Sequence, residues 1–472
     1  MGKIWDLKKF DNNLAIKDDR GNEITYCELN DIANNIYSAI GRRCLVFSFC
    51  RNEIGSVLGY VAFLNNGIVP VQLNSTLEVA LRNELMEKYE PAYVWVPKDM
   101  TSEFSDYSLV YSSYDYVLLK TNYSKEYALF DELALLITTS GSTGSPKFVR
   151  QAYKNIISNA ESIAEYLQLD STERPITTLP MNYVYGLSII NSHFLVGAAL
   201  MVTDKTLMQK EFWSFFKESN ATSFGGVPYT YEMLDKLRFY RMDLPSLRTM
   251  TQAGGKITPE LHEKFALYAE ENHKNFVVMY GAAEATSRMG YLPPERAVEK
   301  KGSMGIPIPG GKYRLVDADG NDISTPNTVG ELVYEGENVT LGYAEKGDDL
   351  SLDDERHGIL FTGDMAQFDE DGYFYIVGRK KRFLKIFGNR VNLDEVDRLI
   401  KGEFNIEVAS SGVDDHMYIF IVDNSMADKV KDFIVSKTGL NQVAFKVMVI
   451  ESIPKNDAGK TLYKELTKYY AE

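Results

Sequence analysis

The chain has 472 residues, of which 44% are hydrophobic, and its 66 acidic and 51 basic residues give a formal net charge of −15. This length exceeds one ordinary domain and predicts about two to four. The acidic balance disfavours a broad nucleic-acid-binding surface, because phosphate backbones require a basic footprint, so no nucleic-acid partner is expected.

The predicted elements alternate between helices and strands, which favours an α/β fold. Apolar residues at helical spacing predict helices over residues 26–40 and 57–64. Short apolar runs predict strands over residues 45–49, 68–71, 134–137, 199–202, 276–279 and 332–334.

A domain boundary is predicted after residues 372–378, which form a hairpin-like strand. Six basic residues and no acidic residue follow between Gly378 and Val391. This run is either a solvated linker or a surface that attracts an anionic partner. We expect a large N-terminal domain of several subdomains with mixed sheets (residues 1–379) and a small, mobile α+β C-terminal domain (residues 380–472).

The cysteines and the N-terminus bear on location. Cys27, Cys44 and Cys50 form no CxxC pair, which argues against a disulfide framework or a zinc site. The first residues lack a signal-peptide core, and no apolar run reaches the roughly 18 residues that span a bilayer. We expect a soluble cytoplasmic protein without a transmembrane segment, and the sequence leaves monomer and homodimer open.

Residues 138–147 form a loop rich in glycine and small hydroxyl residues that ends in Lys147. Glycines let the main chain approach an anion, and successive N–H groups can surround phosphate oxygens. The spacing matches neither the GxxxxGK[ST] loop nor the GxSxG nucleophile elbow. By composition alone the loop is a candidate phosphate site or an ordinary flexible turn.

The stretch TSGSTGSPK (residues 139–147) resembles the phosphate loop of the adenylate-forming superfamily, which includes acyl-CoA synthetases, peptide-synthetase adenylation domains and luciferases. Other segments match that superfamily in the same order, and their joint order is far more specific than any one motif. They are ITYCEL (24–29), TLPMNYVYGL (178–187), QAGGK (252–256), YGAAEAT (280–286), GEL (330–332) with GY (342–343), TGD (362–364), GR (378–379) with KIFG (385–388), and PKNDAGK (454–460).

The resemblance implies that a carboxylic acid attacks the α-phosphate of ATP, with Mg²⁺ bound and pyrophosphate leaving, and that the acyl group then passes to a thiol. Positioning and charge neutralisation supply most of the rate in such a reaction. Glu284 would hold Mg²⁺, and Glu284, Thr286 and Lys460 are the candidate catalytic residues. The residues expected to bind ATP or AMP are Thr139, Ser140, Gly141, Ser142, Thr143, Gly144, Lys147, Gly254, Gly255, Tyr280, Gly281, Ala282, Ala283, Asp364, Ile376 and Arg379.

The resemblance also implies an acyl pocket and a thiol channel. Tyr183 and Gly186 belong to the acyl-pocket segment. The C-terminal domain would swing about a hinge at Lys381 and bring Lys385 and Gly388 to the site for thioester formation. The thiol would be CoA or the phosphopantetheine of an acyl carrier protein.

Two positions depart from the superfamily pattern. Ala283 stands where a threonine hydroxyl usually contacts the α-phosphate, a contact worth about 0.5–1.5 kcal/mol. Tyr183 stands where many acyl-CoA synthetases have histidine, and no acidic residue follows it to pair with a substrate ammonium. We therefore expect a neutral or hydroxylated acyl group rather than one with a free α-amine.

Other interpretations stay open from the sequence alone. Asp364 is also a typical turn residue, Glu284 a typical cap of a helix starting near Ala283, and Lys460 a typical solvated terminal lysine. With Ala283 as its clue, the chain could be a non-catalytic nucleotide-binding sensor or scaffold. A luciferase-like oxygenase has no positive feature. The sequence does not distinguish which acid is activated, or CoA from a carrier protein.

Overall fold

The computed structural model describes residues 3–138, 147–386, 389–413, 415–438, 440–455 and 461–470. The chain folds into two compact units, the first formed by Met1–Tyr313 and Tyr334–Leu360 and the second by Arg314–Val333 and Phe361–Glu472. The domain boundary expected between residues 379 and 380 stays a prediction.

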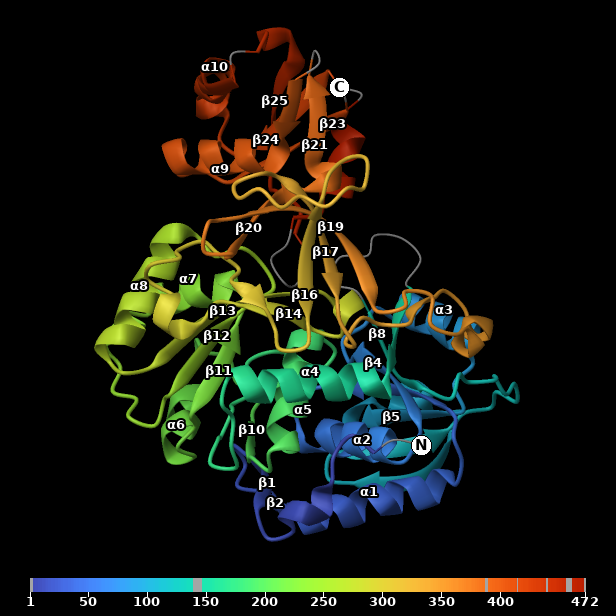
Figure 1. Cartoon of the computed structure of the whole chain (residues 1–472). Coiled ribbons are helices and arrows are strands. Elements are labelled where there is room, and N and C mark those ends of the chain that lie inside the picture. Colours follow the sequence, from blue (N-terminus) through green and yellow to red (C-terminus); the bar gives the residue numbers. More distant parts are fainter. Residues whose placement is uncertain are drawn as a thin grey trace. The chain divides into compact units, whose positions relative to one another are not determined.

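Helices occur along the whole chain (Figure 1). Their bounds are α1 Tyr26–Ile40, α2 Ile54–Asn65, α3 Val79–Tyr89, α4 Tyr153–Tyr166, α5 Val184–Leu195, α6 Lys210–Glu218, α7 Pro228–Lys236, α8 Pro259–Glu271, α9 Leu393–Phe404, α10 Ala427–Thr438 and α11 Tyr463–Leu466. Helix α1 has the predicted bounds because its ends carry strong local signals. Thr25 and Glu28 form a capping box at its start, and Gly41 ends it in the left-handed conformation.

The first unit contains an eight-stranded sheet in the order β18-β9-β8-β4-β3-β5-β7-β6. Its centre is parallel, since β3 pairs with β4 and β5, and β4 pairs with β8. The bounds are β3 Leu45–Cys50, β4 Val69–Asn74, β5 Tyr93–Pro97, β6 Ser108–Ser113, β7 Tyr116–Lys120, β8 Leu133–Thr138, β9 Phe148–Ala152 and β18 Gly342–Ala344. The residues of β3 are all buried, as expected for a strand covered on both faces.

A five-stranded sheet in the order β11-β12-β13-β14-β15 and a three-stranded sheet in the order β10-β1-β2 complete the first unit. The bounds are β1 Leu14–Asp18, β2 Glu23–Thr25, β10 Leu200–Val202, β11 Ser223–Gly226, β12 Thr249–Gln252, β13 Asn275–Gly281, β14 Arg288–Tyr291 and β15 Ile306–Pro307. Strands β11, β12 and β13 run parallel, and β14 returns antiparallel to β13.

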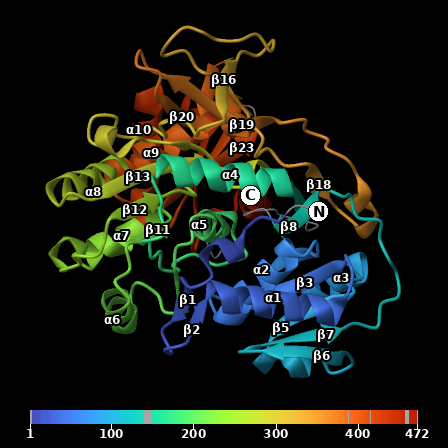
Figure 2. The same ribbon diagram turned by 60° about the horizontal axis from the view of Figure 1, so that its bottom comes forward.

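Helices α4 and α5 lie between the five-stranded and the eight-stranded sheets in both ribbon views (Figures 1 and 2). One face of α5 packs with α2 and β8 through Leu187 and Ile190. Its other face packs through Tyr185 and Ile189 against Met279 of β13. Helix α5 is therefore buried on all sides, and its residues form the wall between the two layers.

The second unit holds most residues of a four-stranded sheet in the order β16-β17-β19-β20, together with the hairpin β21-β22 and the sheet β23-β24-β25. The bounds are β16 Lys312–Val316, β17 Gly330–Glu335, β19 Ile359–Phe368, β20 Phe374–Arg379, β21 Phe383–Ile386, β22 Asn389–Asn392, β23 Val408–Val413, β24 His416–Ile421 and β25 Phe445–Val449. Helices α9 and α10 share an apolar core with β24 and β25.

The predicted strands and helices are all present, and the α/β fold class is confirmed. Among the described residues, no helix combines the length and the apolarity that crossing a membrane requires. The mobility expected of the C-terminal domain stays a prediction.

Candidate functional site

The predicted phosphate loop connects two strands that pair with each other. Thr138 at the end of β8 lies opposite Phe148 at the start of β9. Lys147 stands directly before β9, and its Nζ lies 3.7 Å from the centroid of the Tyr343 ring. The remaining loop residues lie outside the described residues; they are Thr139, Ser140, Gly141, Ser142, Thr143 and Gly144.

Glu284 lies at the centre of a polar cluster in the first unit. The Tyr343 hydroxyl donates a hydrogen bond of 2.6 Å to Glu284 Oε1. The main-chain N–H and the hydroxyl of Thr340 both donate to the Glu284 carbonyl, at 3.0 and 2.9 Å. Burial, and then the neighbouring Glu284 carboxylate, raise the pKa of Tyr343 to about 12. Tyr343 is therefore a stable donor at neutral pH, and it orients one carboxylate oxygen of Glu284.

Two cations surround the same tyrosine. Besides Lys147, the Arg356 guanidinium lies 4.7 Å from the Tyr343 ring centroid, and it donates to the Thr340 hydroxyl. A carboxylate and two cations thus converge on one aromatic side chain. This is the charge pattern that a metal-bound polyphosphate needs, since the carboxylate suits the metal and the cations suit the phosphates.

The chain turns sharply after Glu284. Residues Ala283–Ala285 form one short 3-10 turn with Glu284 in it, so the alternative that Glu284 caps a helix starting near Ala283 stays open. Thr286 follows with φ 63° and ψ −56°, and the Ser287 N–H donates to the Ala285 carbonyl at 2.6 Å. This is a γ-turn with positive φ, a rare and strained conformation.

Thr286, a predicted catalytic residue, is 5% exposed. Its hydroxyl donates to the Asn338 carbonyl at 2.7 Å. The hydroxyl thus has a main-chain partner and holds the turn in place. No described contact joins it to the Glu284 carboxylate, and its catalytic role stays a prediction.

The predicted adenine-side residues come together at one sheet edge. Gly254 and Gly255 follow β12, and Tyr280 and Gly281 end β13, with Ala282 and Ala283 next in the chain. Because β12 and β13 are parallel neighbours, their carboxyl ends lie side by side, where α/β proteins bind ligands. A Cβ on Gly281 would lie 1.8 Å from the Ser287 carbonyl oxygen, so this close chain crossing requires glycine.

The acyl-pocket residues adjoin that edge. Tyr183 precedes the first residue of α5. Its hydroxyl lies so close to Gly254, whose φ is +82°, that a Cβ added to Gly254 would be 2.5 Å from it. Burial raises the pKa of Tyr183. Gly186 allows α5 to approach the preceding chain, because a Cβ there would lie 2.5 Å from the Pro180 carbonyl oxygen. The structure therefore joins the predicted acyl and adenine segments through Tyr183 and Gly254.

Asp364 and Arg379 form a pair within the second unit. They face each other across β19 and β20, and Arg379 Nε lies 2.6 Å from Asp364 Oδ1. Asp364 is 4% exposed, whereas the Arg379 side chain is 62% exposed. Ile376 lies on β20 opposite Ala366. Asp364 thus lies in a strand and holds an ion pair with Arg379, and its role in nucleotide binding stays a prediction.

The remaining predicted residues are also in the second unit. Lys381 lies in the 3-10 turn η7 (Lys380–Arg382), and Lys385 lies in β21. Gly388 and Lys460 lie outside the described residues.

The basic run of residues 379–390 is partly neutralised within its own unit. Besides the Arg379 pair, Lys380 Nζ lies 2.6 Å from Glu331 Oε2. Arg382 pairs with Asp394 at 2.8 Å and with Asp397 at 2.9 Å. These pairs reduce the positive field available to an anionic partner.

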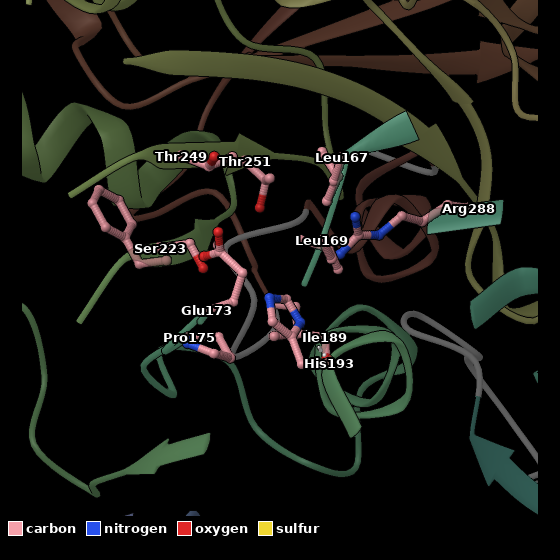
Figure 3. Close-up of a pocket in the computed structure, with 12 residues that line it drawn as sticks. Leu167, Leu169, Glu173, Pro175, Ile189, His193, Ser223, Thr249, Thr251 and Arg288 are labelled. Carbon is pink, nitrogen blue, oxygen red and sulfur yellow. Dashed lines mark hydrogen bonds between the residues drawn. The ribbon is translucent and has the colours of Figure 1, made fainter. Parts of the chain in front are cut away.

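The sequence interpretation missed a small buried cavity beside the acyl segment. It has a volume of about 10 Å³, and α5, β11, β12 and β14 contribute residues to its wall. Figure 3 shows Arg288 of β14 and His193 of α5 beside it. Arg288 stands two residues after Thr286, the last residue of the YGAAEAT motif. A basic residue so close to that motif was the one sequence signal that could have pointed to the cavity.

Comparisons with known proteins show which family the chain belongs to. The sequence pattern described as "AMP-binding enzyme" matches residues 5–344. The chain belongs to the AMP-binding enzyme family. Relatives of this family member include the oxalate–CoA ligase of Arabidopsis thaliana, 27% identical over 361 residues that cover 72% of this chain and 68% of the relative. The 2-succinylbenzoate–CoA ligase of Oceanobacillus iheyensis is 26% identical and covers 98% of this chain and 93% of its own.

Solved structures share the fold of this AMP-binding enzyme. The o-succinylbenzoate CoA synthetase MenE of Bacillus subtilis in complex with AMP superimposes with a TM-score of 0.79 and 21% identity, covering 99% of this chain and 98% of its own. ATP-bound MatB of Rhodopseudomonas palustris superimposes with a TM-score of 0.77 and 19% identity, covering 98% and 96%. The likeness confirms the adenylate-forming fold.

Proposed function

We propose that this enzyme is an AMP-forming acid–thiol ligase: it uses ATP to convert a carboxylic acid to an acyl-adenylate, releases pyrophosphate, and transfers the acyl group to CoA. The observation that carries the proposal is the cluster of Glu284, Tyr343, Lys147 and Arg356 in a member of the AMP-binding enzyme family. The relatives named above are CoA ligases of chemically different acids, and they support CoA as the acceptor.

The donor set around Glu284 fits Mg²⁺. Among the described residues no group of three or more His, Cys, Asp or Glu side chains gathers to hold a metal. Magnesium commonly uses one or two carboxylates and takes its other ligands from water and substrate phosphates, so a single carboxylate is compatible with it. Bound there, Mg²⁺ would neutralise phosphate charge. Tyr343 holds one Glu284 oxygen by a hydrogen bond and directs the carboxylate.

The other residues would act by position and charge. Lys147 stands at the end of the loop and would contact the terminal phosphates. Asp364 would accept hydrogen bonds from the ribose hydroxyls, with Arg379 as a further donor. Lys460 would stabilise charge on the attacking carboxylate and the α-phosphate. Loss of such a preorganised cation costs about 3–4 kcal/mol in the barrier, by analogy with an oxyanion-hole donor.

The acceptor and the location are also proposals. We propose CoA as the acceptor and not a carrier protein, because the relatives are named CoA ligases. The basic run, which is partly neutralised, also offers little support for an acidic protein partner. A cytoplasmic location agrees with Cys27, Cys44 and Cys50, which are free thiols. Whether the enzyme is a monomer or a homodimer stays a prediction.

The test is acid-dependent exchange of pyrophosphate into ATP, screened over fatty, aryl, hydroxy and amino acids. Exchange with any acid excludes a non-catalytic sensor or scaffold. Lys460→Ala should abolish exchange yet still form a thioester from supplied acyl-adenylate and CoA. Survival of both half-reactions in that variant would contradict the role of Lys460. Thioester formation with a carrier protein and none with CoA would overturn the proposed acceptor.

A further inference from the structure

The starting point is a difference among the buried arginines. Arg82, Arg150 and Arg288 are the buried arginines in the described part of the chain. Arg82 pairs with the Glu103 carboxylate, and Arg150 pairs with the Glu355 carboxylate. Arg288 has no carboxylate within ion-pair distance among the described residues.

The contacts of Arg288 are all with neutral groups. Its Nε donates to the Ser188 hydroxyl at 3.1 Å, and its Nη1 contacts the Tyr166 hydroxyl at 3.0 Å and Met279 Sδ at 3.1 Å. The Tyr185 ring centroid lies 5.2 Å from the guanidinium carbon. Arg288 is 2% exposed, and a buried charge without a counter-ion is costly. Such a cation is a candidate binding group.

A second, independent observation comes from His193, which lines the same cavity and is 3% exposed. Its Nδ1 lies 2.8 Å from the Ile189 carbonyl, which only accepts, so Nδ1 carries the proton. Nε2 is then an acceptor, and it has no hydrogen-bond partner among the described residues. Burial lowers the pKa of His193 to about 4, which keeps the ring neutral.

The cavity thus offers a cationic donor and a neutral acceptor. A hydroxyl group satisfies both, because it accepts one hydrogen bond and donates another. The volume of about 10 Å³ suits one water-sized group and not a three-atom carboxylate. Glu173 also lines the cavity, and although Arg248 pairs with it at 3.1 Å, its carboxylate would repel a second one.

The position of the cavity relates it to the acyl segment. Tyr185, Ile189 and His193 are spaced by four residues and so share one face of α5. Tyr185 and Ile189 belong to the apolar cluster that contains Tyr183, beside Gly254. This face of α5 leads from Tyr185 in the acyl segment to Ile189 and His193 in the cavity wall.

We propose that the acid activated by this enzyme carries a hydroxyl group on its carbon chain, and that this hydroxyl accepts a hydrogen bond from Arg288 and donates one to His193 Nε2. The inference rests on the proposed function and narrows its substrate class to hydroxy acids. Arg288 and His193 are then the residues that determine specificity.

The experiment compares matched acids in pyrophosphate exchange. Each ω-hydroxy acid from hydroxyacetate to ω-hydroxyhexanoate is tested against the acid with a methyl group in place of the hydroxyl, and against the acid with a carboxylate there. We expect kcat/KM for the hydroxy acid to exceed both by about tenfold or more at one chain length, the value of one well-placed hydrogen bond. Equal or better use of the methyl acid or the dicarboxylic acid at every length overturns the inference.

The variants His193→Leu and Arg288→Met should reduce that ratio toward one. His262→Leu is the matched control: His262 is also buried, but its Nε2 contacts the Ala297 carbonyl at 2.9 Å and its Nδ1 accepts from the Gly302 N–H. This control should lose stability and keep the wild-type ratio. If His193→Leu or Arg288→Met folds and keeps the wild-type ratio of kcat/KM between the hydroxy acid and the methyl acid, the inference is contradicted. If both variants fail to fold, the ratio measured for the wild type is the test.

Calorimetric binding of the same acids to the AMP-bound enzyme needs no turnover and separates this inference from the proposed function. Selective binding of the hydroxy acid without any exchange supports the cavity and contradicts the ligase function. Exchange without a hydroxyl preference contradicts the cavity alone. If no hydroxy acid binds and no acid of any class supports exchange, both proposals are contradicted.

Discussion

The hydrogen bond from Tyr343 to Glu284 gives a direct test of the proposed metal-binding group. Tyr343→Phe removes the hydroxyl that donates at 2.6 Å and keeps the ring beside Lys147 and Arg356. A hydrogen bond to a charged group is worth about 1.5–3 kcal/mol. Because Tyr343 is half-buried, we take the lower half, about 1.5–2 kcal/mol. This predicts a loss of about ten- to thirtyfold in kcat/KM.

The assay is pyrophosphate exchange, measured over an ATP series to give kcat/KM and over a Mg²⁺ titration at saturating acid. Without its donor the Glu284 carboxylate samples more rotamers, so half-saturation should require more Mg²⁺. Tyr26→Phe is the matched control, because it deletes a buried hydroxyl that donates to the Ala198 carbonyl at 2.7 Å, and Tyr26 is not among the residues expected to bind ATP, AMP or Mg²⁺. It should lose stability and keep the wild-type Mg²⁺ dependence.

An unchanged Mg²⁺ dependence in folded Tyr343→Phe would refute the argument that Tyr343 orients Glu284. A similar loss in Tyr26→Phe would show that the effect comes from general destabilisation.

Three further predictions follow from single contacts. Gly281→Ala should lower the free energy of unfolding in urea by about 2–3 kcal/mol, because its Cβ would lie 1.8 Å from a main-chain oxygen. Gly402→Ala in α9 is the control and should not lower it, because a Cβ there would have no atom within 4 Å; equal effects of the two substitutions would contradict the clash. Lys147→Met should raise the KM for ATP about tenfold and leave AMP affinity unchanged, since Lys147 is assigned to the terminal phosphates; an equal loss of AMP affinity would contradict that assignment. Burial lowers the folded-state pKa of His193 from 6.5 to about 4, so the stability that depends on a neutral His193 is full above pH 6.5 and is lost as the pH falls toward 4. Between pH 7 and pH 5, the free energy of unfolding in urea should fall by about 2 kcal/mol more in the wild type than in His193→Leu. Parallel pH curves for the two proteins would contradict a neutral buried His193.

The elements that the sequence predicted best are those with local signals. Helix α1 starts and ends at the predicted residues because Thr25, Glu28 and Gly41 act within one turn of its ends. Strands such as β3 are continuous apolar runs, and burial on both faces requires that pattern. The nucleotide motifs were found for a similar reason, since the glycines and acidic residues of each motif lie within a few positions of one another.

The parts that the sequence did not reveal depend on pairs distant in the chain. His193 and Arg288 line the same cavity although they are 95 positions apart in the chain, and neither belongs to a motif. The sequence left the basic run open as a solvated linker or a surface for an anionic partner, because its own stretch holds no acidic residue. Glu331 and Asp397, which neutralise part of it, lie outside that stretch, and only the fold brings them close.

The strained turn at Thr286 links the two parts of the proposed site in the first unit. Arg288 lies opposite Gly281 across β13 and β14, so the residues between them must reverse direction in a short distance. Asn338 holds this reversal: its Nδ2 donates to the carbonyls of Ala285 and Arg288 at 2.9 and 3.0 Å, and its carbonyl accepts from the Thr286 hydroxyl. Strain of about 1–3 kcal/mol persists only where such contacts determine the conformation.

The chain enters this reversal just after Glu284 and leaves it at Arg288. The proposed metal-binding carboxylate and the proposed specificity cation are therefore fixed by the same few hydrogen bonds. A change of φ at Thr286 toward a relaxed value would alter the direction in which the chain enters β14. The Arg288 guanidinium would then change its position as well. Glycine would adopt this φ at lower cost, but it would lose the hydrogen bond from the Thr286 hydroxyl to the Asn338 carbonyl.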